Sequence, residues 1–114
     1  MSGMKGAAGP LLATLGVIVG FAATSAPSAA QDAAAKVQKG RELFDDYGCG
    51  SCHTLADAGA TGHVGPGLDG NTKLSEAFVA DRIKNGEGAM PAFGQLSPED
   101  IATLSSYVMQ ASKK

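Results

Sequence analysis

The chain has 114 residues and a formal net charge of −2, and 18% of its side chains are charged. This length allows one domain at most, and the weakly acidic balance gives no sign of nucleic-acid binding. A structural zinc ion needs about four ligands, and the chain has only two cysteines and two histidines, which are not spaced as a zinc pair.

Residues 1–30 have the pattern of a secretory signal peptide. Lys5 is the first charge, residues 11–23 form an apolar run, and Ser28-Ala29-Ala30 is a small-residue cleavage site. The apolar run of thirteen residues is shorter than the roughly 20 that a membrane-spanning helix needs. We therefore predict that residues 1–30 are removed on export and that residues 31–114 form the functional domain.

An uncleaved membrane anchor is the alternative, because residues 6–23 make a stretch of eighteen residues without a charge. The cleaved domain would have 84 residues, with eight basic and eleven acidic side chains and a formal charge of −3. A domain of this size buries only a marginal core by itself. We therefore expect a tightly held cofactor to complete the core.

Residues 31–47 predict the first helix, because most of them are good helix formers. The residues of one face recur at three- and four-residue steps: Val37, Gly40, Phe44 and Tyr47. A glycine inside a helix costs about 1 kcal/mol. A close crossing with another helix would justify Gly40, and Gly48 then ends the helix.

The next five residues form the C-x-x-C-H signature of c-type haem attachment: Cys49, Gly50, Ser51, Cys52 and His53. The two thiols can add to the two vinyl groups of a haem, which one helical turn between Cys49 and Cys52 would span. His53 follows at once and can give a ring nitrogen to the iron. A thioredoxin-like redox pair would need a βαβ setting, and the sequence has no strand pattern. A plain disulfide between the two cysteines is the remaining alternative.

Residues 54–72 predict a glycine-rich loop that contains Gly65-Pro66-Gly67-Leu68. A metal-bound histidine usually donates its other ring N–H to a carbonyl group. A rigid turn soon after His53 could present that carbonyl, and Pro66 is the candidate; the alternative is that Pro66 only shapes the loop. His63 lies only ten residues after His53 in the same loop, so we expect it to brace the loop or face solvent rather than to bind iron.

Two further helices are predicted, over residues 75–86 and 97–111. Ser75 and Ser97 are suitable N-caps, and Asp100 completes an S-x-x-D box with Ser97. Apolar residues recur at helical spacing in both helices: Phe78, Val79 and Ile83 in the first, and Ile101, Leu104, Val108 and Ala111, with Tyr107 beside them, in the second.

The loop between these helices contains Met90 and Pro91, and Met90 lies thirty-seven residues after His53. A thioether is a soft ligand suited to iron opposite a histidine. The structural alternative is a methionine that fills a gap in the core. Met109 is the rival ligand, but it lies off the apolar face of the last helix. Met90 is therefore the predicted sixth ligand.

The order of haem motif, Gly-Pro turn, Met-Pro loop and amphipathic last helix resembles the class I cytochromes c of bacteria, which hold one haem with histidine and methionine ligands. The likeness covers residues 37–111. In that family a glycine and an aromatic residue on the first helix meet a leucine and an aromatic residue on the last. The matching residues here are Gly40 and Phe44, and Leu104 and Tyr107. Gly67 is a departure, since the family often has an asparagine there that braces the loop.

This resemblance implies an all-α fold, the small cytochrome c domain, in which three to four helices surround one covalent haem and the N- and C-terminal helices cross. It implies haem c attached through Cys49 and Cys52, with His53 and Met90 as the metal ligands. It also implies that the carbonyl of Pro66 accepts the N–H of His53.

Two protein ligands leave the iron no open position, which favours electron transfer over substrate chemistry, so we expect no enzymatic activity. The expected function is an exported, periplasmic electron-transfer protein that works as a monomer or in transient complexes. Its expected partners are a quinol-oxidising complex, a terminal oxidase or a dehydrogenase, with membrane contact only if residues 1–30 remain. The alternative is the haem c subunit of a periplasmic dehydrogenase. A haem-based gas sensor or peroxidase would require Met90 to leave the iron.

Overall fold

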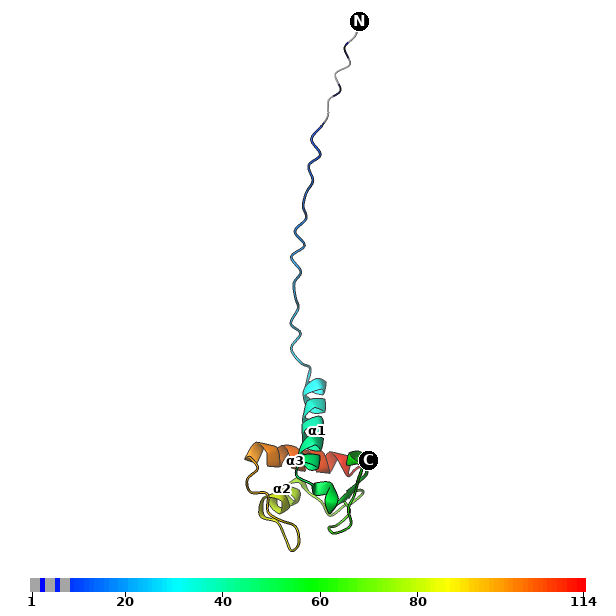
Figure 1. Ribbon diagram of the computed structural model, residues 1–114, viewed down its shortest axis with the longest axis vertical. Helices are drawn as coiled ribbons and strands as arrows, with labels where there is room; N and C mark the ends of the chain where they lie inside the picture. Colours follow the sequence, from blue (N-terminus) through cyan, green and yellow to red (C-terminus); the bar gives the residue numbers. More distant parts are fainter. Residues whose placement is uncertain (1–2, 4–5, 7–8) are drawn as a thin grey trace.

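The computed structural model describes residue 3, residue 6 and residues 9–114. Residues 9–28 form no helix or strand and extend away from the folded body (Figure 1). Within the described residues, no helix is both long and apolar enough to cross a membrane. Lys5, the charge that opens the predicted signal segment, lies outside the described residues, and the removal of residues 1–30 stays a prediction.

Within the described part of the chain, the folded body has three α-helices, with two short 3-10 helices and two short strands between the first and the second (Figure 1). The α-helices are α1 (Ala29–Asp46), α2 (Glu76–Asn85) and α3 (Pro98–Ala111). The 3-10 helices are η1 (Cys49–Ser51) and η2 (Ala56–Ala58), and the strands are β1 (Thr54–Leu55) and β2 (Ala60–Thr61). The mainly helical fold confirms the predicted class.

The first helix begins two residues earlier than predicted, because Ser28 and Gln31 form a capping box. The Ser28 Oγ accepts from the Gln31 amide at 3.3 Å, and the Ser28 amide donates to the Gln31 Oε1 at 2.9 Å. The first turns of α1 are exposed and project beyond the body (Figure 1). These residues also have the small-residue pattern of a cleavage site, so the cap was not predicted.

Helices α1 and α3 cross at close range, as we predicted from the presence of Gly40 inside the first helix. A Cβ atom placed on Gly40 would overlap the Cβ of Tyr107 and lie 3.1 Å from the carbonyl oxygen of Thr103. One helical turn after Gly40, the ring of Phe44 meets the ring of Tyr107 edge to face, with centroids 6.1 Å apart. Phe44, Leu104 and Tyr107 are each 1% exposed. The crossing is therefore the centre of the hydrophobic core.

The predicted N-cap hydrogen bonds of α2 and α3 are both present. The Ser75 Oγ accepts from the amide of Phe78 at 3.2 Å, and the Ser97 Oγ accepts from the amide of Asp100 at 3.0 Å. The Ser97 cap works through the backbone amide of Asp100, and the Asp100 carboxylate makes no return bond to the Ser97 amide. The predicted S-x-x-D box is therefore half formed.

The loop after the haem motif contains a small hairpin that the sequence analysis did not predict. Strands β1 and β2 pair antiparallel, with Thr54 opposite Thr61 and Leu55 opposite Ala60, and η2 makes the turn between them. Leu55 is fully buried. Two-residue strands are too short to show an alternating pattern, so sequence periodicity could not have revealed them.

Candidate cofactor site

All five predicted site residues line one cavity of about 500 Å³. They come from separate parts of the chain: Cys49, Cys52 and His53 from the motif, Pro66 from the following loop and Met90 from the loop after α2. The apolar wall is made by Phe44, Val64, Leu68, Leu74, Phe78, Val79, Ile83, Leu104 and Val108. The fold thus gathers the five site residues, which lie up to forty-one positions apart, around one mostly apolar space.

The C-x-x-C-H motif forms a tight turn that directs its functional groups to this cavity. The amides of Cys52 and His53 both donate to the carbonyl of Cys49, at 3.2 and 3.0 Å. Both cysteine thiols are free, and burial raises the pKa of the Cys49 thiol to about 11. Cys49 is therefore a neutral thiol at neutral pH, and no disulfide joins the pair in this structure.

The Nδ1 of His53 lies 2.7 Å from the carbonyl oxygen of Pro66. A carbonyl can only accept, so Nδ1 must carry the proton in this contact, which leaves the lone pair of Nε2 free. Gly65 lets the turn approach so closely, because a Cβ there would lie 2.9 Å from the Nδ1 of His53. The Gly65 amide also donates to the Cys52 carbonyl at 2.7 Å. The turn therefore does more than shape the loop.

Met90 is half-buried, packs against the core and lines the cavity. Its backbone is fixed by two hydrogen bonds with Glu87, from the Glu87 amide to the Met90 carbonyl at 3.1 Å and from the Met90 amide to the Glu87 carbonyl at 2.9 Å. Met109 packs against the core from α3 and does not line the cavity, and exposed His63 does not line it either. Of these three side chains, Met90 is therefore the one that lines the cavity.

Arg82 is a site residue that the sequence analysis missed. Its guanidinium carbon lies 4.8 Å above the ring centre of Phe78, and its Nε lies 3.1 Å from a carboxylate oxygen of Glu87. The Nε is nevertheless buried without a hydrogen-bond partner, because that contact lacks hydrogen-bond geometry. Arg82 follows Phe78 and Val79 by four and three residues, so helical spacing alone places it on the same face.

Asn71 explains how the loop is braced without an asparagine at position 67. Its Nδ2 donates to the carbonyl of Gly67 at 3.2 Å, and its Oδ1 accepts from the amide of Lys73 at 3.0 Å. An asparagine four residues further along therefore holds the backbone of Gly67. The sequence contains this side chain, but only the folded loop shows where it points.

These residues fit a haem. The cavity offers two thiols, an imidazole with a free nitrogen, a thioether and a mostly apolar wall, which suit a flat apolar ring with iron at its centre. Lys73 and Arg82 add positive charge at the same cavity, where Arg82 also forms an ion pair with Glu87. The Nε of Arg82, which has no hydrogen-bond partner, is a donor available to an acceptor such as a carboxylate of the ring.

Comparison with known proteins agrees with this geometry. Residues 35–108 match the family described as cytochrome C oxidase, cbb3-type, subunit III. Cytochrome c6 of Picosynechococcus sp. is 39% identical over 111 residues, which cover 86% of this chain and 89% of that protein. The cytochrome c subunit of 4-cresol dehydrogenase (hydroxylating) from Pseudomonas putida is 34% identical over 106 residues, covering 91% of this chain and 87% of the relative.

A solved structure is similar over the folded body. The crystal structure of the c-type cytochrome SorU from Sinorhizobium meliloti superimposes with a TM-score of 0.63 and 42% sequence identity. The match covers 70% of this chain and 95% of the SorU chain.

Proposed function

Because this chain belongs to the cytochrome c family, as a monohaem class I member with covalent haem c, we propose that it carries single electrons between redox proteins. The observation that carries the proposal is the meeting of the attachment turn, the His53–Pro66 contact and Met90 at one cavity. Both candidate iron ligands are held by their own backbone contacts, so the site is built to keep them in place.

We assign the thioether bonds to Cys49 and Cys52 and the iron ligands to His53 and Met90. Haem c supplies a one-electron couple between Fe(III) and Fe(II). The Pro66 carbonyl holds the ring of His53 so that its other nitrogen is available to the iron. The thioether of Met90 and the apolar wall favour the reduced state and raise the potential. With both His53 and Met90 bound, the iron would have no open position for water or substrate, so the chain would have no enzymatic activity of its own.

The absorption spectrum of the haem-loaded protein tests this assignment. We expect a six-coordinate, low-spin c-type spectrum in both oxidation states, and no change when carbon monoxide is added to the reduced protein. Both ligands must stay on the iron for this result. A marked shift with carbon monoxide would mean an open or labile position, and the gas-sensor or peroxidase function would replace electron transfer.

The second candidate is the haem c subunit of a periplasmic dehydrogenase. The cytochrome c subunit of 4-cresol dehydrogenase supports it, since the similarity extends over most of both chains. Gel filtration of the native extract distinguishes the two functions. A diffusible carrier that meets a quinol-oxidising complex and a terminal oxidase elutes at the size of a monomer, whereas a subunit elutes with a larger enzyme.

We also propose that residues 1–30 are removed and that the domain works in the periplasm. Cleavage before Gln31 would take away Ser28, so α1 would lose its capping box and its first, exposed turn would fray. The intact mass of the natural protein should equal residues 31–114 plus one haem. A mass that includes the first thirty residues would instead support the membrane-anchored alternative.

A further inference from the structure

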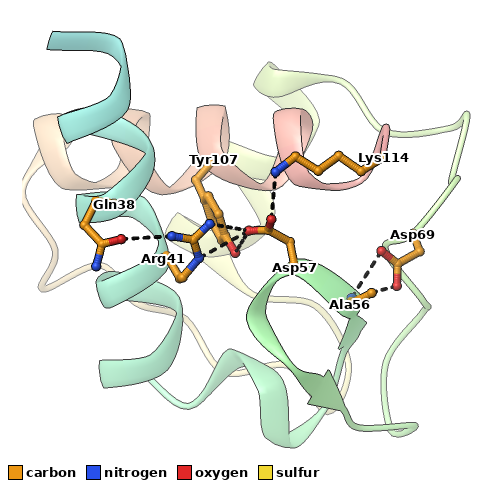
Figure 2. A network of polar contacts seen from close by, with 7 residues as sticks. All are labelled: Gln38, Arg41, Ala56, Asp57, Asp69, Tyr107 and Lys114. Atoms are coloured by element: carbon orange, nitrogen blue, oxygen red, sulfur yellow. Dashed lines mark hydrogen bonds and ion pairs between the residues drawn. The ribbon is translucent and has the colours of Figure 1, made fainter. Parts of the chain in front are cut away.

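The carboxylate of Asp57 gathers donors from three distant parts of the chain (Figure 2). It accepts from Arg41 Nη2, from Tyr107 Oη and from Lys114 Nζ, each at 2.8 Å, and from Arg41 Nε at 3.3 Å. Arg41 belongs to α1, Tyr107 to α3, and Lys114 is the last residue of the chain. The Asp57 side chain is only 11% exposed, whereas the side chains of Arg41 and Lys114 are 33% and 67% exposed.

The cluster sets two cations, Arg41 and Lys114, against the one carboxylate of Asp57. The hydrogen bonds from Lys114, Tyr107 and Arg41, in that order, hold the pKa of Asp57 well below its usual range. Burial, together with the hydrogen bond to Asp57, raises the pKa of Tyr107 to about 12. At neutral pH the carboxylate is therefore an anion and the tyrosine hydroxyl is a donor, which makes these charge-assisted hydrogen bonds.

Asp57 lies in η2, at the turn of the hairpin that follows His53. Backbone hydrogen bonds join this hairpin and the chain after it to the haem-attachment turn. The amide of Gly62 donates to the Gly50 carbonyl at 3.1 Å, and the amide of Gly65 donates to the Cys52 carbonyl at 2.7 Å. Whatever holds η2 in place thus also restrains the attachment turn.

We propose that Asp57 is a positioning residue for the haem site, which fastens the hairpin to the α1–α3 crossing and so holds the attachment turn and the His53 ring in place. A two-stranded hairpin with two-residue strands has little stability of its own. The side chain of Tyr107 links the helix crossing to the hairpin. Its Cβ packs over Gly40, and its hydroxyl donates a hydrogen bond to Asp57. The effect at the iron rests on the proposed function, whereas the fastening of the hairpin does not.

The first test uses NMR to measure amide hydrogen exchange in the reduced, haem-loaded protein. In Asp57→Asn we expect the amides of Gly62 and Gly65 to exchange at least about tenfold faster, the factor that corresponds to losing one charged hydrogen bond. The amide of Ile83 in α2 should change much less. Uniform acceleration of all three amides would mean that Asp57 only stabilises the whole fold, and would overturn the proposal.

Ile101→Val is the matched control, because Ile101 is buried in α3, contributes to the core and does not line the cofactor cavity. This variant lowers global stability by packing alone, so it should accelerate exchange without preference for the hairpin. Tyr107→Phe keeps the ring at the crossing and removes only the hydroxyl. We expect it to change the same amides as Asp57→Asn by a smaller factor, which keeps the proposal testable if Asp57→Asn does not fold.

The second test reads the orientation of His53 through the shifts of the haem methyl groups in the NMR spectrum of the oxidised protein. Asp57→Asn should displace these shifts, whereas Ile101→Val should leave them unchanged. Unchanged shifts in Asp57→Asn would refute the positioning role. The carbon monoxide experiment is independent of both tests, so a failure of the electron-transfer proposal would be recognised separately.

Discussion

Met90→Ala is expected to keep its covalent haem and to lose the sixth ligand of the iron. The attachment turn lies on a different segment from Met90, so the thioether bonds should form as before. Loss of the thioether removes the ligand that favours Fe(II), and the reduction potential should fall by an amount on the order of 0.1 V. Redox titration measures this fall, and addition of carbon monoxide to the reduced variant should now shift the spectrum.

Met109→Ala is the control for this experiment. Met109 packs against the core from α3 but does not line the cavity, so this variant should lose stability and keep the original spectrum and potential. If Met90→Ala kept both the spectrum and the potential of the original protein, Met90 would not be a ligand. The methionine would then be a core residue that fills a gap.

Gly40→Ala is expected to destabilise the protein by up to about 2 kcal/mol in total, because overpacking a core usually costs about 1–3 kcal/mol. The new methyl group would overlap the Cβ of Tyr107 and lie 2.9 Å from its Cγ, so one helix must move. The greater helix propensity of alanine offsets about 1 kcal/mol of this. Gly40→Val, which is bulkier, should be more destabilising. Denaturant unfolding of the haem-loaded protein measures both changes.

Gly67→Ala makes the same chemical change where a Cβ would meet nothing within 4 Å. We therefore expect its denaturant midpoint to stay close to that of the original protein. Equal midpoints for Gly40→Ala and Gly67→Ala would show that the crossing tolerates a methyl group. Since Tyr107 also donates to Asp57, a displaced Tyr107 in Gly40→Ala should loosen the hairpin too.

Sequence patterns that span only a few residues were enough to predict the three α-helices and the types of functional group at the site. Ser75 and Ser97 marked the starts of α2 and α3 correctly, because a cap bonds an amide only three residues away. The C-x-x-C-H motif carries its chemistry within five residues. The spacing of Gly40 and Phe44 on one face, together with the family resemblance, was enough to predict the helix crossing.

The sequence also pointed to residues that the fold then brought together. The carbonyl of Pro66 was one of two interpretations of the Gly-Pro turn, and in the fold its oxygen lies 2.7 Å from the Nδ1 of His53. Met90 was preferred over Met109 from the sequence, because Met109 lies off the apolar face of the last helix, and in the fold Met90 lines the cavity whereas Met109 does not. The chemistry of a residue type is local, whereas the cavity that it faces depends on every element around it.

Only the tertiary structure revealed the Asp57 cluster, the hairpin and the unpartnered Nε of Arg82. The donors of Asp57 lie sixteen, fifty and fifty-seven residues away, at Arg41, Tyr107 and Lys114. Helical hydrogen bonds join residues four apart, so a repeating pattern can predict them. A carboxylate that meets partners from both crossing helices and from the end of the chain has no such pattern, because these partners come together only when the helices have packed.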